Sequence, residues 1–173
     1  HARIPSFILG LLNKTMKFNF VTTAHWVFDT SGMLKYLTNW GFRTVAVSED
    51  IKTYLIDNYN VPAQDITVTI NGINTETFSP GREKGELIKE LGLREDSKKI
   101  VYISRLDESR SLVAKHLVEI ANEIKEKYDV EIIIVGGGDD LNNIESLCYS
   151  ANKKAERKFI TLTGARTDIS RFT

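Results

Sequence analysis

Apolar and polar positions alternate along the chain in segments of two kinds. Short apolar runs are typical of buried strands, whereas longer stretches with apolar residues three or four positions apart are typical of amphipathic helices. In the second half the two kinds follow each other, with strands expected at 100–103, 131–135 and 159–163. Because parallel strands need a crossover connection, this order predicts a parallel sheet covered by helices.

The first half of the chain shows the same alternation. Strands are expected at 18–23, 44–47 and 66–70, the last with strict alternation of apolar and threonine residues. Helices are expected at 5–13 and 32–40, and a third begins after Ser48, a good N-cap residue followed by two acids. The apolar side of the first helix would consist of Ile8, Leu9, Leu11 and Leu12.

The helices of the second half have recognisable ends and faces. A short helix is expected to stop at Gly92, and Asp139 or Asp140 can cap the last helix. The segment 79–81 is the best linker, which predicts two domains, 1–80 and 81–173. The expected apolar faces are Val113, His116, Leu117, Ile120, Ala121 and Ile124 in one helix, and Leu141, Ile144, Leu147, Cys148 and Ala151 in the next.

Composition narrows the classes of function. The chain has 173 residues, a formal net charge of zero and a pI near 7.0, so no general basic field would hold nucleic acid. Cys148 is the single cysteine, which favours a reducing, cytoplasmic compartment and an inert core thiol. No apolar stretch approaches the roughly 20 residues of a membrane span. No cluster has the spacing of metal ligands, so no metal is expected.

The most informative motif is Ser-Arg-Leu-Asp at 104–107, directly after an apolar run and before an amphipathic helix. Arg105 would lie at the carboxyl end of a buried strand, where open α/β sheets bind ligands. An arginine beside a helix N-terminus makes an anion site, and a phosphate or diphosphate is the simplest ligand. Arg110 could complete a clamp; taken alone, it reads as a surface arginine.

Glycines 136–138 form the second candidate. Gly136 and Gly138 could let a phosphate approach the backbone, or they could simply make a tight turn. The dinucleotide fingerprint requires a third glycine where Leu141 stands, which argues against a nicotinamide or flavin site. The acidic pair Asp139 and Asp140 argues against a phosphate directly on this turn.

His25 follows the first predicted strand and is the third candidate. A histidine at the carboxyl end of a strand can donate a hydrogen bond to a substrate hydroxyl or act as an acid or base. A lone histidine is more often structural, and nothing in its spacing alone decides between the two roles.

Further short segments accompany these candidates. They are Val-Ala-Val-Ser-Glu at 45–49, Asn-Gly-Ile-Asn at 71–74 with Phe-Ser-Pro at 78–80, Ser-Arg-Leu-Asp at 104–107, Ile-Val-Gly-Gly-Gly at 134–138, and Leu-Thr-Gly at 162–164. Together they resemble the motifs of family 4 glycosyltransferases, in the family's order and at about its spacing over nearly the whole chain. Ser104 and Asn74 stand where the family usually has Gly and Asp.

The resemblance implies the GT-B fold, in which two Rossmann-like domains face across a cleft. It implies retaining, metal-independent transfer from a nucleotide-sugar donor, most often a UDP-sugar, with no further cofactor. Arg105 and Arg110 would hold the diphosphate with Gly136 and Gly138, and His25 would contact the donor sugar as the catalytic residue. The loop with Gly164 and Arg166 would lie against the nucleotide base.

The acceptor implied by the resemblance is a saccharide or a lipid-linked molecule, in polysaccharide or glycolipid synthesis. A lipid-linked acceptor would bring the protein to the inner face of the membrane as a peripheral partner. The family's pair of spaced glutamates would follow Thr173, and its first strands would precede His1, so we expect an inactive fragment of a longer enzyme. A sugar-nucleotide 2-epimerase and a non-catalytic nucleotide-sugar-binding module of GT-B type remain alternatives.

Overall fold

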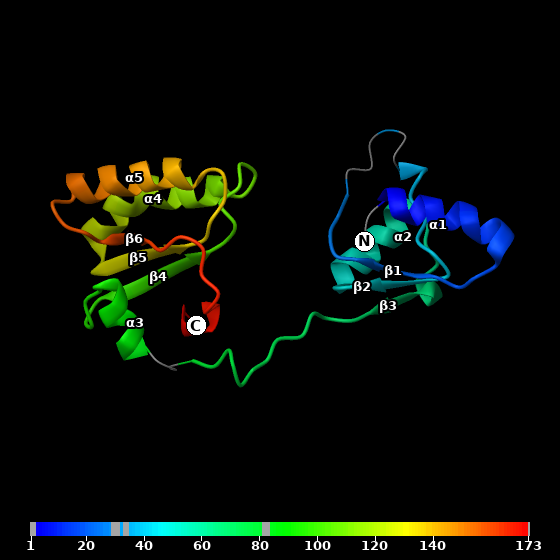
Figure 1. The fold of residues 1–173 in the computed structure, drawn as a ribbon, viewed down its shortest axis with the longest axis horizontal. Helices are drawn as coiled ribbons and strands as arrows, with labels where there is room; N and C mark the ends of the chain where they lie inside the picture. The colour runs from blue at the N-terminus through cyan, green and yellow to red at the C-terminus, as the bar shows by residue number, and fades with distance from the viewer. Residues whose placement is uncertain (1–2, 29–31, 33–34, 81–83, 173) are drawn as a thin grey trace. The chain divides into compact units, whose positions relative to one another are not determined.

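The computed structural model describes residues 3–28, 32, 35–80 and 84–172. The chain forms two compact units, His1–Ile73 and Asn74–Thr173, each with its own three-stranded parallel sheet and flanking helices (Figure 1). The predicted fold class, α/β with Rossmann-like parallel sheets, is therefore confirmed. The two units divide after Ile73, whereas the predicted linker comes at 79–81, of which residue 81 lies outside the described residues.

In the first unit, the sheet has the strand order β1-β2-β3 and the core lies between this sheet and α2. Ser48 caps α2 as predicted, because its Oγ accepts a hydrogen bond from the Ile51 N–H at 3.2 Å. The buried core residues are Ala24, Ala46, Ile51, Leu55 and Ile66. The elements are α1 (Arg3–Met16), β1 (Val21–Ala24), β2 (Arg43–Ala46), α2 (Glu49–Tyr59), η2 (Ala63–Asp65) and β3 (Ile66–Val68).

The helix predicted at 32–40 is wrong for residues 35–40, which form a turn and an irregular segment; residues 33–34 lie outside the described residues. Side chains from the sheet form hydrogen bonds with the backbone of this segment. The hydroxyls of Thr22 and Thr44 donate to the Trp40 carbonyl at 2.5 and 2.9 Å, which fixes Trp40 to the sheet. A helical pattern in the sequence was thus overridden by tertiary hydrogen bonds.

Helix α1 also departs from expectation. Ile8, Leu9, Leu11 and Leu12, predicted as its packed side, are between 38% and 49% exposed. Its small and polar side is turned inward instead, with Ser6 buried. Periodicity predicted that this helix exists, but not which of its sides packs on the described part of the unit.

The second unit has the strand order β4-β5-β6, and the central strand β5 is buried along its whole length. The register places Ile132 beside Ile100 and Ile160. Helix α3 stops before Gly92 as predicted, where φ is +63°. The elements are α3 (Lys84–Leu91), β4 (Lys98–Ile103), α4 (Ser111–Lys127), β5 (Val130–Val135), α5 (Leu141–Lys154), β6 (Ile160–Leu162) and η3 (Ile169–Phe172).

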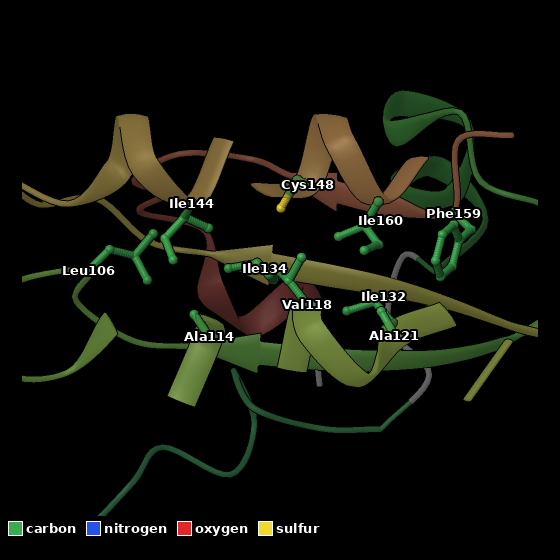
Figure 2. Packing of buried hydrophobic residues seen from close by; sticks show 11 residues of the cluster. Leu106, Ala114, Val118, Ala121, Ile132, Ile134, Ile144, Cys148, Phe159 and Ile160 are labelled. Carbon is green, nitrogen blue, oxygen red and sulfur yellow. The ribbon is translucent and has the colours of Figure 1, made fainter. Parts of the chain in front are cut away.

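Helices α4 and α5 cover one face of this sheet (Figure 1), and Figure 2 shows their small side chains against the isoleucines of β5. The packed face of α4 consists of Ala114, Val118 and Ala121, whereas Val113 and Ile120, predicted as core, are 56% and 47% exposed. Small residues at these positions allow the helix to pack closely against the sheet. Cys148 belongs to this core as predicted (Figure 2), and burial raises its thiol pKa to about 11.

Candidate functional site

Three loops meet at the carboxyl edge of the second sheet, and backbone hydrogen bonds join them. The Leu106 N–H donates to the Gly137 carbonyl at 3.0 Å, and the Asp140 N–H donates to the Leu106 carbonyl at 3.0 Å. The Gly136 N–H donates to the Gly164 carbonyl at 2.9 Å. The structure therefore brings together the loops that carry the predicted Arg105, Gly136, Gly138 and Gly164.

Steric contacts explain why positions 136 and 138 are glycines. A Cβ at Gly136 would overlap the Ser104 carbonyl oxygen, and one at Gly138 would overlap the Leu106 carbonyl. Their φ angles, +156° and +157°, also disfavour other residues. These two glycines thus allow their own loop to pack closely against the loop of Ser104 and Leu106. Their predicted contact with a phosphate remains a prediction.

The two predicted arginines differ in their surroundings. Arg105 is exposed, and among residues 3–28, 32, 35–80 and 84–172 no carboxylate pairs with it. The Arg110 guanidinium forms an ion pair with Asp107 of its own loop, and the Ser109 hydroxyl donates to the same carboxylate at 2.6 Å. The Ser109 hydroxyl and Arg110 together hold the Asp107 pKa below its usual range. Arg105 is therefore the cation of this loop that stays available to an anion.

Arg110 is the N-cap residue of α4, which begins at Ser111, and Arg105 lies earlier in the same loop. The first N–H groups of a helix lack partners within the helix, and the helix dipole places partial positive charge there. A guanidinium and a helix N-terminus next to each other favour a phosphate group.

Arg166 lies in the third loop but is committed to carboxylates. It donates to Asp168 at 2.8 and 2.5 Å and to Glu90 of α3 at 2.6 Å, and Arg171 joins the same two acids. These pairs raise the Arg166 pKa and lower those of Asp168 and Glu90. The network ties the loop after β6 to α3. The predicted contact with a nucleotide base would then be made by the loop with Gly164 as a whole, because the Arg166 guanidinium is already paired.

Asp140 occupies the N-cap position of α5, one of the two predicted cap residues, but does not cap through its side chain. It is only 8% exposed and pairs with Lys115 of α4 at 2.6 Å, while the Asn143 amide donates to it at 2.5 Å. Lys115 is the main reason that the Asp140 pKa falls to about 2. Sequence spacing did not reveal Lys115, because the pair joins two helices separated by a strand.

This pair predicts an acid-sensitive contribution to stability. The Asp140 pKa is about 2 in the folded chain against 3.8 for the free side chain, so the contribution is present above pH about 4 and is lost as the pH falls toward 2. We expect Asp140→Asn to flatten the fall in the free energy of unfolding over that range. Urea unfolding at several pH values measures it, with the neighbouring Asp139→Asn as control. Equal acid sensitivity of the wild type and Asp140→Asn would contradict the prediction.

His25 belongs to the first unit. It follows β1 directly, after the buried Ala24, and its side chain is exposed at the carboxyl edge of the first sheet. This is the position that the sequence predicted for it. The geometry leaves its catalytic role as a prediction.

Other features lie apart from these residues. A cavity of about 410 Å³ lies against the second sheet between α3 and η3, lined by Val101, Ile133 and Phe172 among others, and no predicted site residue lines it.

Across the described residues, no group of three or more His, Cys, Asp or Glu side chains gathers as a metal site would. None of the helices in the described part of the chain is long and apolar enough to cross a membrane.

The chain is similar to known glycosyltransferase sequences. Residues 1–77 match the family model of Glycosyltransferase Family 4. An uncharacterized glycosyltransferase of Methanocaldococcus jannaschii is 25% identical over 138 residues, which are 78% of this chain and 35% of that protein. The chain therefore spans about a third of this curated relative.

Solved structures share the fold. A glycosyltransferase from Rickettsia africae superposes with a TM-score of 0.69 and 19% identity, over 98% of this chain and 53% of that one. Anabaena HepE, solved in complex with UDP, superposes with a TM-score of 0.72 and 14% identity, over 99% of this chain and 48% of that one. A further HepE structure contains UDP-glucose. The chain thus spans about half the length of these proteins.

Proposed function

We propose that this chain is part of a longer glycosyltransferase of GT-B type. Its similarity to the family 4 glycosyltransferases, whose family model it matches over residues 1–77, supports this proposal. The enzyme transfers a sugar from a nucleotide-sugar donor to a saccharide or lipid-linked acceptor, with retention and without a bound metal. The division into two Rossmann-like units supports the proposal. The 173-residue chain by itself would not turn over substrate.

One observation carries the donor site. Arg105 presents an unpaired guanidinium, within the described part of the chain, at the sheet edge where three loops interlock beside the N-terminus of α4. A diphosphate placed there meets a fixed cation and the helix dipole. The UDP in the HepE structures makes UDP-sugars the first donors to test.

The proposed mechanism uses charge that is already in place. As the bond between the anomeric carbon and the diphosphate breaks, Arg105 stabilises the negative charge that develops on the leaving group. Arg110 can add to this charge only by sharing its guanidinium with Asp107. His25 holds the donor sugar or polarises it toward an oxocarbenium-like state, and the acceptor hydroxyl attacks from the face that the diphosphate leaves.

The proposal predicts that Arg105→Ala weakens nucleotide-sugar binding by about 1.5–3 kcal/mol, the range of one charge-assisted hydrogen bond. The measurement is the dissociation constant of the full-length protein by calorimetry. Arg157→Ala is the matched control, because Arg157 reaches the Val130 carbonyl and Asp129 at the opposite edge of the sheet. Unchanged affinity in a folded Arg105→Ala variant would remove Arg105 from the site.

A thermal-shift panel of UDP-, GDP- and ADP-sugars on the full-length protein tests the function as a whole. A shift with one nucleotide class that disappears in Arg105→Ala supports the donor site and identifies the base. If none of the three nucleotide sugars shifts the melting temperature, the proposed nucleotide-sugar donor of this protein is contradicted.

A further inference from the structure

His25 lies in a short exposed span between two fixed residues of the first unit. The span runs from His25 to Val27, and Trp26 and Val27 are 72% and 49% exposed. On one side of it, Ala24 is buried, pairs with Ala46 in the sheet, and accepts a hydrogen bond from the Val47 N–H at 3.3 Å. The sheet thus fixes one end of the span.

Tyr54 of α2 fixes the other end. Its hydroxyl accepts a hydrogen bond from the Phe28 N–H at 2.9 Å and donates one to the Phe28 carbonyl at 2.5 Å. One side chain therefore satisfies both backbone groups of Phe28, across 26 positions of sequence. The Phe28 ring also lies 6.3 Å from that of Trp40.

The anchor is itself rigidly held. Tyr54 lies on the same helix as Ile51 and Leu55, both in the core, and this helix is capped by Ser48. Its ring lies 5.8 Å from that of Tyr59, which in turn meets Trp40 edge-on at 5.1 Å. The hydroxyl position is thus set by the packing of α2.

We propose that Tyr54 is a positioning residue for His25: by holding Phe28 it limits where the imidazole can lie, without touching the substrate itself. The inference rests on the proposed function, in which His25 acts on the donor sugar. A span of three residues fixed at both ends has few conformations. Without the Tyr54 hydroxyl, the backbone of Phe28 loses both of these hydrogen bonds while its ring contact with Trp40 remains, so the span samples more conformations. Small displacements of a catalytic group have large effects on rate.

Tyr54→Phe is the appropriate variant, because it removes one oxygen and retains the ring and its contact with Tyr59. In the full-length enzyme we expect kcat to fall about tenfold, with the KM for the donor changed less than about twofold and an unchanged melting temperature. Tyr36→Phe is the control, since Tyr36 belongs to the same unit and is 84% exposed. An equal loss in Tyr36→Phe, or a loss of Tyr54→Phe activity explained by a lower melting temperature, would overturn the proposal.

A double-mutant cycle separates positioning from an independent role. If Tyr54 acts through His25, Tyr54→Phe costs nothing further in a His25→Ala background. The same tenfold loss in that background would show that Tyr54 works by another route and would overturn the proposal.

A spectroscopic measurement keeps the proposal testable even if the function is wrong. In protein labelled at the histidine ring carbons, the His25 signal is the one absent from His25→Ala. We expect Tyr54→Phe to shift or broaden this signal and to leave that of His116 unchanged. An unchanged His25 signal refutes the positioning role whatever the activity, whereas full activity of His25→Ala refutes the proposed function and leaves the spectroscopic result standing.

Discussion

Gly136→Ala is expected to lower the free energy of unfolding by roughly 2–4 kcal/mol and to abolish measurable donor binding. The added methyl would overlap the Ser104 carbonyl oxygen, a backbone atom that cannot move without displacing the loop of Arg105. The φ of +156° adds strain. Urea unfolding and calorimetry with a UDP-sugar on the full-length protein measure the two effects.

Gly164→Ala is the matched control. Gly164 also has a positive φ, +74°, but an added Cβ would meet nothing within 4 Å. We expect only the conformational cost of about 1–2 kcal/mol for a left-handed residue. If both variants lost the same stability, the close approach of the two loops would not be the reason for the glycine at 136.

His25→Ala is expected to lower kcat of the full-length enzyme by about a hundredfold while the dissociation constant of the donor stays nearly the same. The diphosphate contributes most of the donor's charge and would be held by Arg105, so we expect binding not to depend on the imidazole. Under the proposed function transfer does depend on it, because the imidazole would act at the sugar. Rates and affinities measured on the same preparation separate the two.

His116→Ala is the control for this variant, since His116 is an exposed histidine of α4. It should retain full activity. A His25→Ala enzyme as active as this control would return His25 to a structural role.

Local features of the chain were predicted well from the sequence. Ser48 as a cap, Gly92 as a helix end and Cys148 as core depend on neighbours a few positions away and on a helical period, and the structure confirms all three. The β4, β5 and β6 strands were also predicted from their short apolar runs, and the structure places them in one parallel sheet. Strand ends were less accurate: β1 begins at Val21, although β-favouring residues begin at Phe18.

Long-range pairings were not predictable. The choice of Ala114 rather than Val113 for the packed face of α4 depends on how closely the helix approaches the sheet. The commitment of Arg166 to Glu90 and of Asp140 to Lys115 joins segments that no spacing rule relates. The Tyr54 anchor spans 26 positions in the same way.

The sequence by itself determined the alternation of strands and helices, the resemblance to a glycosyltransferase family, and the edges at which Arg105 and His25 lie. These follow from periodicity and from short motifs, which are local. The tertiary structure alone decided which arginine stays unpaired, why Gly136 and Gly138 are glycines, and what holds the span of His25 in place. Those answers depend on charges and backbone atoms brought into contact by folding, whose partners lie too far along the chain for any local pattern to reveal.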